Sequence, residues 1–206
     1  MSGISRTGVR RLGIPGVCVV TPLVHSDGRG AFLEWFHAGR LEEMTGRPAT
    51  VAQINVSVSR KGALRGIHYT DVPPGQAKFF SCLKGSVLDV VVDVRVGSPT
   101  YGRWEAVRLD DRTYQGVHVP EGVGHAFMAL ADDTVVAYTC SQPYTPSKDR
   151  RLHPLDASLA IPWPQDAAPL ISPGDRAAPT LAEARQAGIL PEYEKCVRNA
   201  GEWWTG

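Results

Sequence analysis

The sequence lacks three features that would place it in common protein classes: a long hydrophobic run, paired cysteines and a strong excess of charge. No apolar stretch approaches the ~20 residues of a membrane-spanning helix, and no basic-then-apolar leader opens the chain. The four cysteines are scattered without C-x-x-C spacing, and 22 basic against 21 acidic side chains leave a net charge of +1. We therefore expect a soluble cytoplasmic protein with free thiols, no membrane attachment and no nucleic-acid partner.

The histidines lack the spacing of a metal site. Six are present, but none forms an H-x-H pair, the spacing that points two ligands to the same side of a strand. His118 and His125 are separated by a loop that contains Pro120. We therefore expect a site without a metal.

Turn-forming residues are abundant, with 21 glycines and 16 prolines among 206 residues. Between them lie roughly ten short segments with the period-two alternation of β-strands. The strongest is 86–96, where an apolar face lies opposite Asp89, Asp93 and Arg95. No long helical pattern alternates with the strands, so we predict an all-β sandwich or barrel that forms a single domain over residues 1–206, with its core at about 12–180.

The chain after Pro143 has a different composition. Eight prolines between 143 and 179 indicate an extended, wrapping segment rather than a series of strands. A helix is predicted over Thr180–Ala187, because Thr180 and Glu183 have the spacing of a capping box and Gly188 suits the C-terminal cap. Residues 181–206, with Trp203 and Trp204 near the end, form a short C-terminal extension.

Polar residues gather between 53 and 78. In the strand predicted over 53–59, Gln53 and Asn55 lie on the face opposite the β-branched residues. In the next, over 63–70, alternation places Arg65 and His68 on opposite faces. Lys78 follows a Pro-Pro-Gly break and begins another apolar run. This arrangement is typical of a site built on a sheet.

Taken singly, each of these residues has an ordinary structural interpretation. His68 can be a half-buried structural histidine, and Lys78 beside a Pro/Gly loop is most often a surface lysine. Tyr138 is by default an aromatic core residue with a satisfied hydroxyl. Period two does not decide which face lines a barrel interior, so spacing alone identifies no site.

The motifs taken together are far more specific, and they follow one another over about residues 12–180. They are Asp27-x-Arg29-Gly30-x-Phe32-x-Glu34, Gln53-x-Asn55-x-Ser57, Lys61-Gly62-x-Leu64-Arg65-Gly66-x-His68-Tyr69, Gln76-x-Lys78, Asp89-Val90-x-Val92-Asp93-x-Arg95, Pro120-x-Gly122-x-x-His125-x-Phe127, Tyr138-x-Cys140, Ile161-x-Trp163-Pro164 and Ser172-Pro173-Gly174-Asp175. This series resembles the RmlC family, dTDP-4-dehydrorhamnose 3,5-epimerase and its relatives in deoxysugar biosynthesis.

The resemblance implies a jelly-roll cupin barrel, an isomerase activity on a dTDP-4-keto-6-deoxyhexose, and a homodimer with exchanged N-terminal strands. The catalytic positions it implies are His68 as general base, Asp175 as its dyad partner, Tyr138 as the acid on the opposite sugar face and Lys78 as the enolate stabiliser. The substrate-binding positions it implies are Arg29 and Glu34, which would reach the partner subunit's site, with Gln53, Asn55, Arg65 and His125. Asp89 matches a position that supports the site.

These residue types suit inversion of a carbon next to a ketone. A neutral imidazole, with an ordinary pKa of about 6.5, can remove the proton, and a carboxylate behind it fixes the tautomer. An ammonium stabilises the enolate oxygen, and a phenol can return a proton to the other face. Arginines bind a diphosphate through paired hydrogen bonds. Such a set requires no metal or redox cofactor.

Two departures and several alternatives remain open. His118 lies where the family more often has an aromatic residue, and the stretch 151–155 lacks the family's common tryptophan. The motifs do not distinguish inversion at C3 alone from inversion at C3 and C5. The alternatives are a cupin ketoisomerase that moves the carbonyl between C4 and C3, a non-catalytic nucleotide-sugar-binding cupin and, most remotely, a metal-dependent cupin oxygenase.

Overall fold

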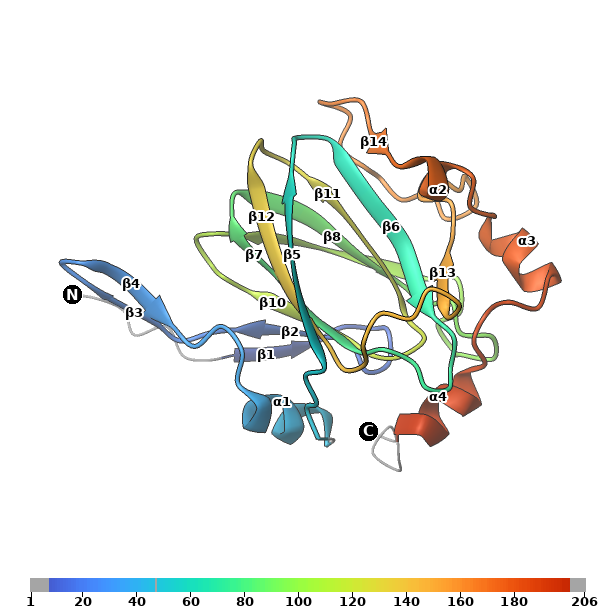
Figure 1. The fold of residues 1–206 in the computed structure, drawn as a ribbon, viewed down its shortest axis with the longest axis horizontal. Helices are drawn as coiled ribbons and strands as arrows, with labels where there is room; N and C mark the ends of the chain where they lie inside the picture. Colours follow the sequence, from blue (N-terminus) through green and yellow to red (C-terminus); the bar gives the residue numbers. More distant parts are fainter. Residues whose placement is uncertain (1–7, 47, 201–206) are drawn as a thin grey trace.

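The computed structural model describes residues 8–46 and 48–200. Most of its strands form two sheets that face each other, while helices lie at the periphery (Figure 1). The first sheet has the order β1 (Gly8–Arg11), β2 (Cys18–Thr21), β10 (Gly116–Val119), β7 (Lys78–Lys84), β12 (Thr134–Cys140) and β5 (Gln53–Ser59). The second has the order β13 (Asp149–Arg151), β6 (Ala63–Thr70), β11 (Gly124–Ala129), β8 (Ser86–Val92) and β9 (Trp104–Asp110), with β14 (Leu170–Ile171) parallel to β6. The predicted all-β jelly roll is confirmed, with two sheets that stay separate.

The buried apolar side chains form two clusters, one on each side of the second sheet. The cluster between the sheets includes Phe80 of β7, Val91 of β8 and Phe127 of β11. The other cluster joins the outer face of the second sheet to the C-terminal segment, with Val90 of β8 packed near Trp163. Strand β8 is therefore buried on both faces, which explains its nearly continuous hydrophobic sequence.

Strand β8 ends at Val92, four residues earlier than the sequence predicts. The side chain of Asp93 accepts a hydrogen bond from the backbone N–H of Arg95 at 3.1 Å and pairs with the Arg95 guanidinium at 2.8 Å. Ser98 and Thr100 donate to its other carboxylate oxygen. This local network competes with the strand ladder, and it pairs two charged side chains that are fully buried.

A β-bulge interrupts the alternation of β6 at Gly66. His68 pairs with His125 and Arg65 pairs with Phe127, so Gly66 and Ile67 together lie opposite Ala126. Gly66 has a φ of +119°, and a Cβ there would lie 2.5 Å from the Cβ of Ala126. The prediction that Arg65 and His68 lie on opposite faces was therefore wrong, because the extra residue turns both side chains toward the interior.

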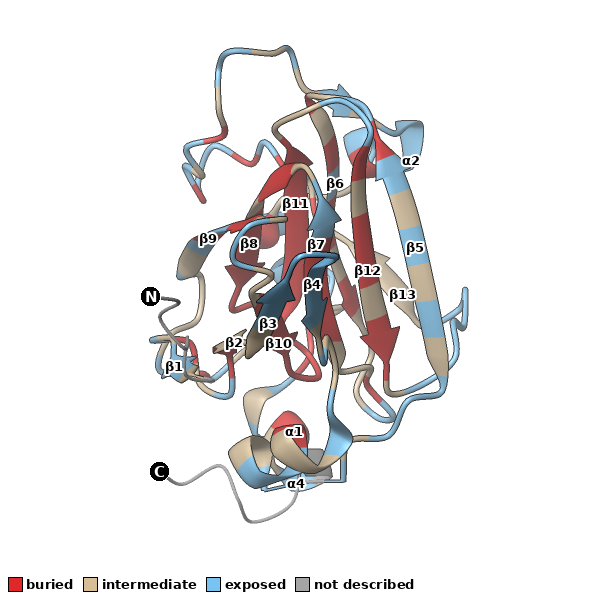
Figure 2. Cartoon of the chain, turned by 90° about the vertical axis from the view of Figure 1, so that its left-hand side faces the viewer, coloured by how far each residue is buried: buried red, intermediate tan, exposed pale blue. Residues whose placement is uncertain are grey.

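The first sheet leaves an apolar face in solvent at strand β5 (Figure 2). Ile54, Val56 and Val58 are 59%, 65% and 62% exposed. Gln53 and Asn55 lie on the opposite, inward face of the same strand. A hairpin of β3 (Val24–Asp27) and β4 (Gly30–Leu33) projects from the body beside this sheet (Figure 1). Helix α1 (Ala38–Thr45) follows it, with Gly46 as its C-terminal cap.

The segment after Pro143 wraps the second sheet, but it contains more regular structure than predicted. It forms β13 and β14 along the edge of β6 and the short helix α2 (Pro173–Arg176). Helix α3 (Leu181–Gln186) has the predicted capping box, and α4 (Tyr193–Ala200) follows it. Trp203 and Trp204 lie outside the described residues. No helix within 8–46 or 48–200 combines the length and apolar character needed to cross a membrane.

Candidate active site

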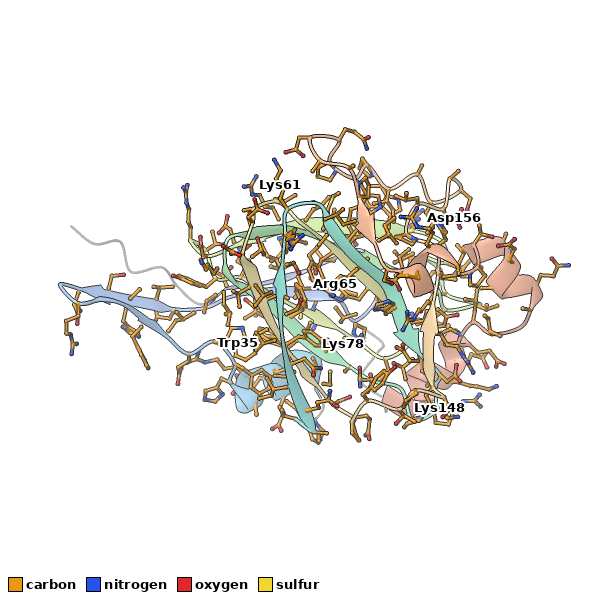
Figure 3. All side chains as sticks on the ribbon, turned by 45° about the horizontal axis from the view of Figure 1, so that its top comes forward. Trp35, Lys61, Arg65, Lys78, Lys148 and Asp156 are labelled. Atoms are coloured by element: carbon orange, nitrogen blue, oxygen red, sulfur yellow. The ribbon has the colours of Figure 1, made fainter. Side chains whose placement is uncertain are left out.

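A cavity of about 650 Å³ opens between the two sheets beneath α2. Its walls come from β5, β6, β7, β11, β12, β13, β14 and α2. Figure 3 shows Arg65 and Lys78 near the centre of the molecule, whereas Lys61 and Lys148 lie at its periphery. The polar and charged side chains that line the cavity are Ser57, Arg65, His68, Lys78, His125, Tyr138, Arg151, Ser172, Asp175 and Arg176.

His68 and Asp175 form a hydrogen-bonded pair in this cavity, although 107 residues separate them in the sequence. His68 Nε2 lies 2.7 Å from Asp175 Oδ1. Helix α2 presents the aspartate, and its N-terminal cap is Ser172, whose hydroxyl accepts a hydrogen bond from the Asp175 N–H at 3.1 Å. Because α2 is held over the end of β13, a buried carboxylate is aimed at the imidazole.

Asp175 is ionised in this setting. Burial favours its neutral form, but the hydrogen bond and charge of His68, the Ser172 hydroxyl and Arg151 outweigh burial, so the pKa of Asp175 is lowered. An ionised carboxylate only accepts hydrogen bonds, so His68 must donate through Nε2–H. The lone pair of Nδ1 then remains available to accept a proton.

Tyr138 and Lys78 come from the opposite sheet. Tyr138 on β12 stacks on Phe80 with ring centroids 5.9 Å apart. Burial raises the pKa of Tyr138, so its phenol keeps its proton well above neutral pH. Lys78 begins β7, and burial lowers its pKa, while nearby Cys140 and Asp149 oppose that shift only in part. A partly desolvated ammonium is a stronger hydrogen-bond donor than one in water.

A second histidine–aspartate pair lies deeper between the sheets. His125 Nε2 lies 2.5 Å from Asp89 Oδ2, and the imidazole packs edge-on against Phe80 at a centroid distance of 4.7 Å. The other carboxylate oxygen, Asp89 Oδ1, is buried without a hydrogen-bond partner among the described residues. Asp89 therefore faces the interior rather than water, and it holds His125 at the base of the cavity.

Three further predicted positions lie on or beside the cavity wall. Arg65 lines the cavity, and its Nε donates to Ser59 Oγ at 3.2 Å. Gln53 Nε2 donates to Asn55 Oδ1 at 2.8 Å, and Asn55 Nδ2 donates to Cys140 Sγ at 3.7 Å. Asn55 pairs across the ladder with Tyr138, so the two amides adjoin the cavity.

Arg29 and Glu34 lie away from this cavity. Arg29 is at the tip of the β3–β4 hairpin, where its guanidinium pairs with Asp27 at 2.6 Å. Glu34 follows β4 and pairs with Arg40 at 2.8 Å. The structure thus does not bring these two residues together with the other predicted site residues of the same chain.

Sequence reasoning missed Arg151, Ser172 and Arg176 as cavity residues. Arg151 lies on β13, within a segment predicted to be irregular. Ser172 had a usable signal, because it begins the Ser-Pro-Gly-Asp stretch that resembles a helix N-terminus with proline at its first position. Across the described part of the chain, no three histidine, cysteine, aspartate or glutamate side chains gather as metal ligands.

Known proteins resemble the chain over almost its full length. The family model described as dTDP-4-dehydrorhamnose 3,5-epimerase matches residues 11–183. A dTDP-4-dehydrorhamnose 3-epimerase from Streptomyces niveus is 53% identical, covering 91% of this chain and 90% of that protein. A dTDP-4-dehydrorhamnose 3,5-epimerase from Mycolicibacterium smegmatis is 46% identical, covering 91% and 92%.

A solved structure agrees in fold as well as in sequence. The crystal structure of ChmJ, a 3'-monoepimerase from Streptomyces bikiniensis in complex with dTDP-quinovose, superposes with a TM-score of 0.91. It is 46% identical, and the match covers 95% of this chain and 98% of that one. Fold and sequence therefore agree with the family predicted from the motifs, and the chain belongs to the dTDP-4-dehydrorhamnose 3,5-epimerase family of isomerases.

Proposed function

We propose that this protein inverts C3 of a dTDP-4-keto-6-deoxyhexose through an enolate, as a step in deoxysugar biosynthesis. The observation that carries the proposal is the placement of His68 and Asp175 on one wall of a single cavity and of Tyr138 and Lys78 on the facing wall. Inversion needs a base and an acid on opposite faces of one carbon, and two facing sheets provide that arrangement. The relatives' names support the substrate class.

Proton removal falls to His68 in this mechanism. Its Nε2–H donates to the Asp175 carboxylate, so Nδ1 accepts the proton from C3. The carbon–hydrogen electron pair moves into a C3–C4 double bond, and the ketone oxygen becomes an enolate. Asp175 stabilises the imidazolium that forms, because its lowered pKa keeps it ionised.

The facing wall completes the reaction. The Lys78 ammonium stabilises the enolate oxygen, and the cost of its partial desolvation is offset when that negative charge develops. The Tyr138 hydroxyl then delivers its proton to C3 from the face opposite His68. Burial raises the pKa of this phenol, so the proton donor is fully populated at neutral pH.

Substrate binding falls to residues around the same cavity. Arg65 offers a guanidinium to the diphosphate, and the amides of Gln53 and Asn55 offer donors and acceptors to the nucleotide. His125, fixed by Asp89, contacts the substrate from the base of the cavity. No cofactor is required by this scheme, because every proton and charge has a protein group to handle it.

We also propose a homodimer with exchanged N-terminal strands. The exposed apolar face of β5 and the projecting β3–β4 hairpin support it, since a lone chain would leave Ile54, Val56 and Val58 in water. In such a dimer Arg29 and Glu34 would reach the partner's cavity. Light scattering should report twice the chain mass for the wild type and a smaller mass for Val56→Glu. A monomeric wild type that turns over substrate would contradict this assembly.

The decisive test of function is proton NMR of dTDP-4-keto-6-deoxyglucose incubated with the protein in heavy water. We expect deuterium to enter C3 with ring couplings that report the inverted configuration. Additional exchange at C5 would make the protein a 3,5-epimerase, and exchange at C3 alone a 3-epimerase. A C3-ketone product would favour the ketoisomerase. Ligand binding without any exchange would overturn the epimerase and leave a binding module.

A further inference from the structure

Arg151 joins the His68–Asp175 pair from a third side. It ends β13 and lies directly across the strand pair from His68. Both side chains line the cavity. Arg151 Nη1 lies 3.4 Å from Asp175 Oδ1, the same oxygen that accepts from His68 at 2.7 Å. One carboxylate oxygen is thus shared by an imidazole and a guanidinium.

Helix α2 leaves space for this guanidinium at Gly174. A Cβ at Gly174 would lie 2.3 Å from Arg151 Nη1, a separation that would force the guanidinium to move. Gly174 does not have a left-handed φ, so its backbone conformation does not require glycine. What glycine provides here is clearance between α2 and the arginine.

The charges around the pair show what Arg151 does. Side chains directly opposite each other on paired strands are close neighbours, and like charges there repel. When His68 is protonated, its cation lies opposite the Arg151 cation. Arg151 therefore stabilises Asp175 as an anion and at the same time disfavours the imidazolium. The second effect opposes the attraction between the Asp175 carboxylate and an imidazolium.

Other charged or titratable groups lie on the elements that pack around the His68–Asp175 pair. Asp149 of β13 partly offsets Arg151, with its Oδ2 3.6 Å from Nη2. Arg151 itself keeps 39% of its side chain exposed. Most of the remaining groups that line the cavity are cationic or neutral. These groups are Arg65 of β6, Lys78 of β7, His125 of β11 with Asp89 of β8, Tyr138 of β12 and Arg176 of α2.

We propose that Arg151 is a positioning residue that holds the Asp175 carboxylate and keeps His68 in the neutral form that removes the substrate proton. The inference rests on the proposed function, in which His68 is the base. Its consequence is an enzyme whose base stays competent at lower pH than an isolated histidine–aspartate pair would allow.

The test is the pH dependence of kcat/KM for C3 exchange in wild type, Arg151→Gln, Arg151→Lys and Gly174→Ala. Activity falls at acid pH as His68 is protonated. In Arg151→Gln we expect this acid limb to move up by about 0.5–1 pH unit, a size typical of one lost neighbouring charge that is partly screened. Gly174→Ala keeps the Arg151 charge but displaces the guanidinium, so the acid limb of this variant should shift in the same direction by a smaller amount. Arg151→Lys should stay near the wild type.

Arg150→Gln is the matched control. It removes a cation from the same strand, but that guanidinium pairs with Asp71 at 2.8 Å and does not line the cavity. Its acid limb should coincide with that of the wild type. A shift in Arg150→Gln equal to that in Arg151→Gln would overturn the proposal, because a general change in charge would then explain both.

Failure of this inference is distinguishable from failure of the proposed function. If His68→Asn abolishes exchange while the acid limbs of Arg151→Gln and Gly174→Ala coincide with that of the wild type, only the role of Arg151 is overturned. A higher KM in Arg151→Gln with an unmoved limb would mark Arg151 as a substrate contact and would also overturn it. If His68→Asn leaves exchange intact, the proposed function fails, and the inference fails with it.

Discussion

The cavity holds two histidine–aspartate pairs of the same composition in different surroundings. In the His68–Asp175 pair the imidazole side chain is 30% exposed and the carboxylate 4%. In the His125–Asp89 pair the corresponding values are 8% and 1%. Asp175 also binds Ser172 and Arg151, whereas Asp89 Oδ1 has no partner in the described part of the chain.

In the proposed mechanism, this difference separates a reacting group from a supporting one. A base must meet a carbon-bound proton and later exchange its own proton with solvent, and the imidazole of His68 is the more exposed of the two. His125 is enclosed by Phe80 and the strand ladder, so the pair it forms with Asp89 fixes one orientation. The proposal therefore gives two pairs of the same composition different roles, according to their burial and to the number of partners that each aspartate has.

The largest expected effect comes from removing the exposed imidazole. His68→Asn should lower the rate of C3 exchange by about 10³–10⁴-fold, because it deletes the general base and keeps a similar volume. Its thermal midpoint should stay close to that of the wild type. His125→Asn is the matched variant, and we expect a smaller loss of rate from it. Equal losses of rate in the two variants, measured by NMR under the same conditions, would remove the distinction between the pairs.

The order should reverse when stability is measured. His125→Asn leaves a buried Asp89 carboxylate without its imidazole partner, which should cost about 3 kcal/mol of unfolding free energy in urea. Replacing both residues with apolar ones, as in Asp89→Leu with His125→Phe, should recover part of that loss, because no unpaired charge remains. If His68→Asn destabilised the protein more than His125→Asn, the supporting role of the buried pair would be wrong.

A smaller effect should appear in the acid stability of the exposed pair. The pKa of Asp175 is lowered, so its contribution to stability is fully present above the ordinary aspartate pKa of about 4. It is lost as pH falls through the lower native value. The difference in unfolding free energy between wild type and Asp175→Asn should therefore be larger at about pH 5 than at about pH 3, and it should shrink below about pH 4. A difference that grew toward acid pH would contradict the assigned direction.

The sequence could predict the strands of the site because their pattern is local. Residues 53–59 and 63–70 alternate cleanly, and the structure has strands with these bounds. The face that each side chain takes could not be predicted in the same way. The bulge at Gly66 depends on Ala126 of a strand 60 residues away, and it brings Arg65 and His68 to one face.

The exposed face of β5 shows a similar limit. Ile54, Val56 and Val58 have the alternation of a buried face, yet they lie outside while Gln53 and Asn55 face inward. Period two identifies two faces but does not say which one meets solvent. Asp175 was found through its motif, whereas the helix that presents it was missed, because four residues carry too little periodicity for a prediction.

The central claim is that base and acid act on opposite faces of one carbon, and Tyr138→Phe tests it most directly. The variant keeps the ring that stacks on Phe80 and removes the proton donor. In heavy water, NMR should show deuterium entering C3 with the original configuration retained, because His68 alone then removes and returns the proton. Inversion at C3 at the wild-type rate in Tyr138→Phe would contradict the claim, since the second proton would then come from another group.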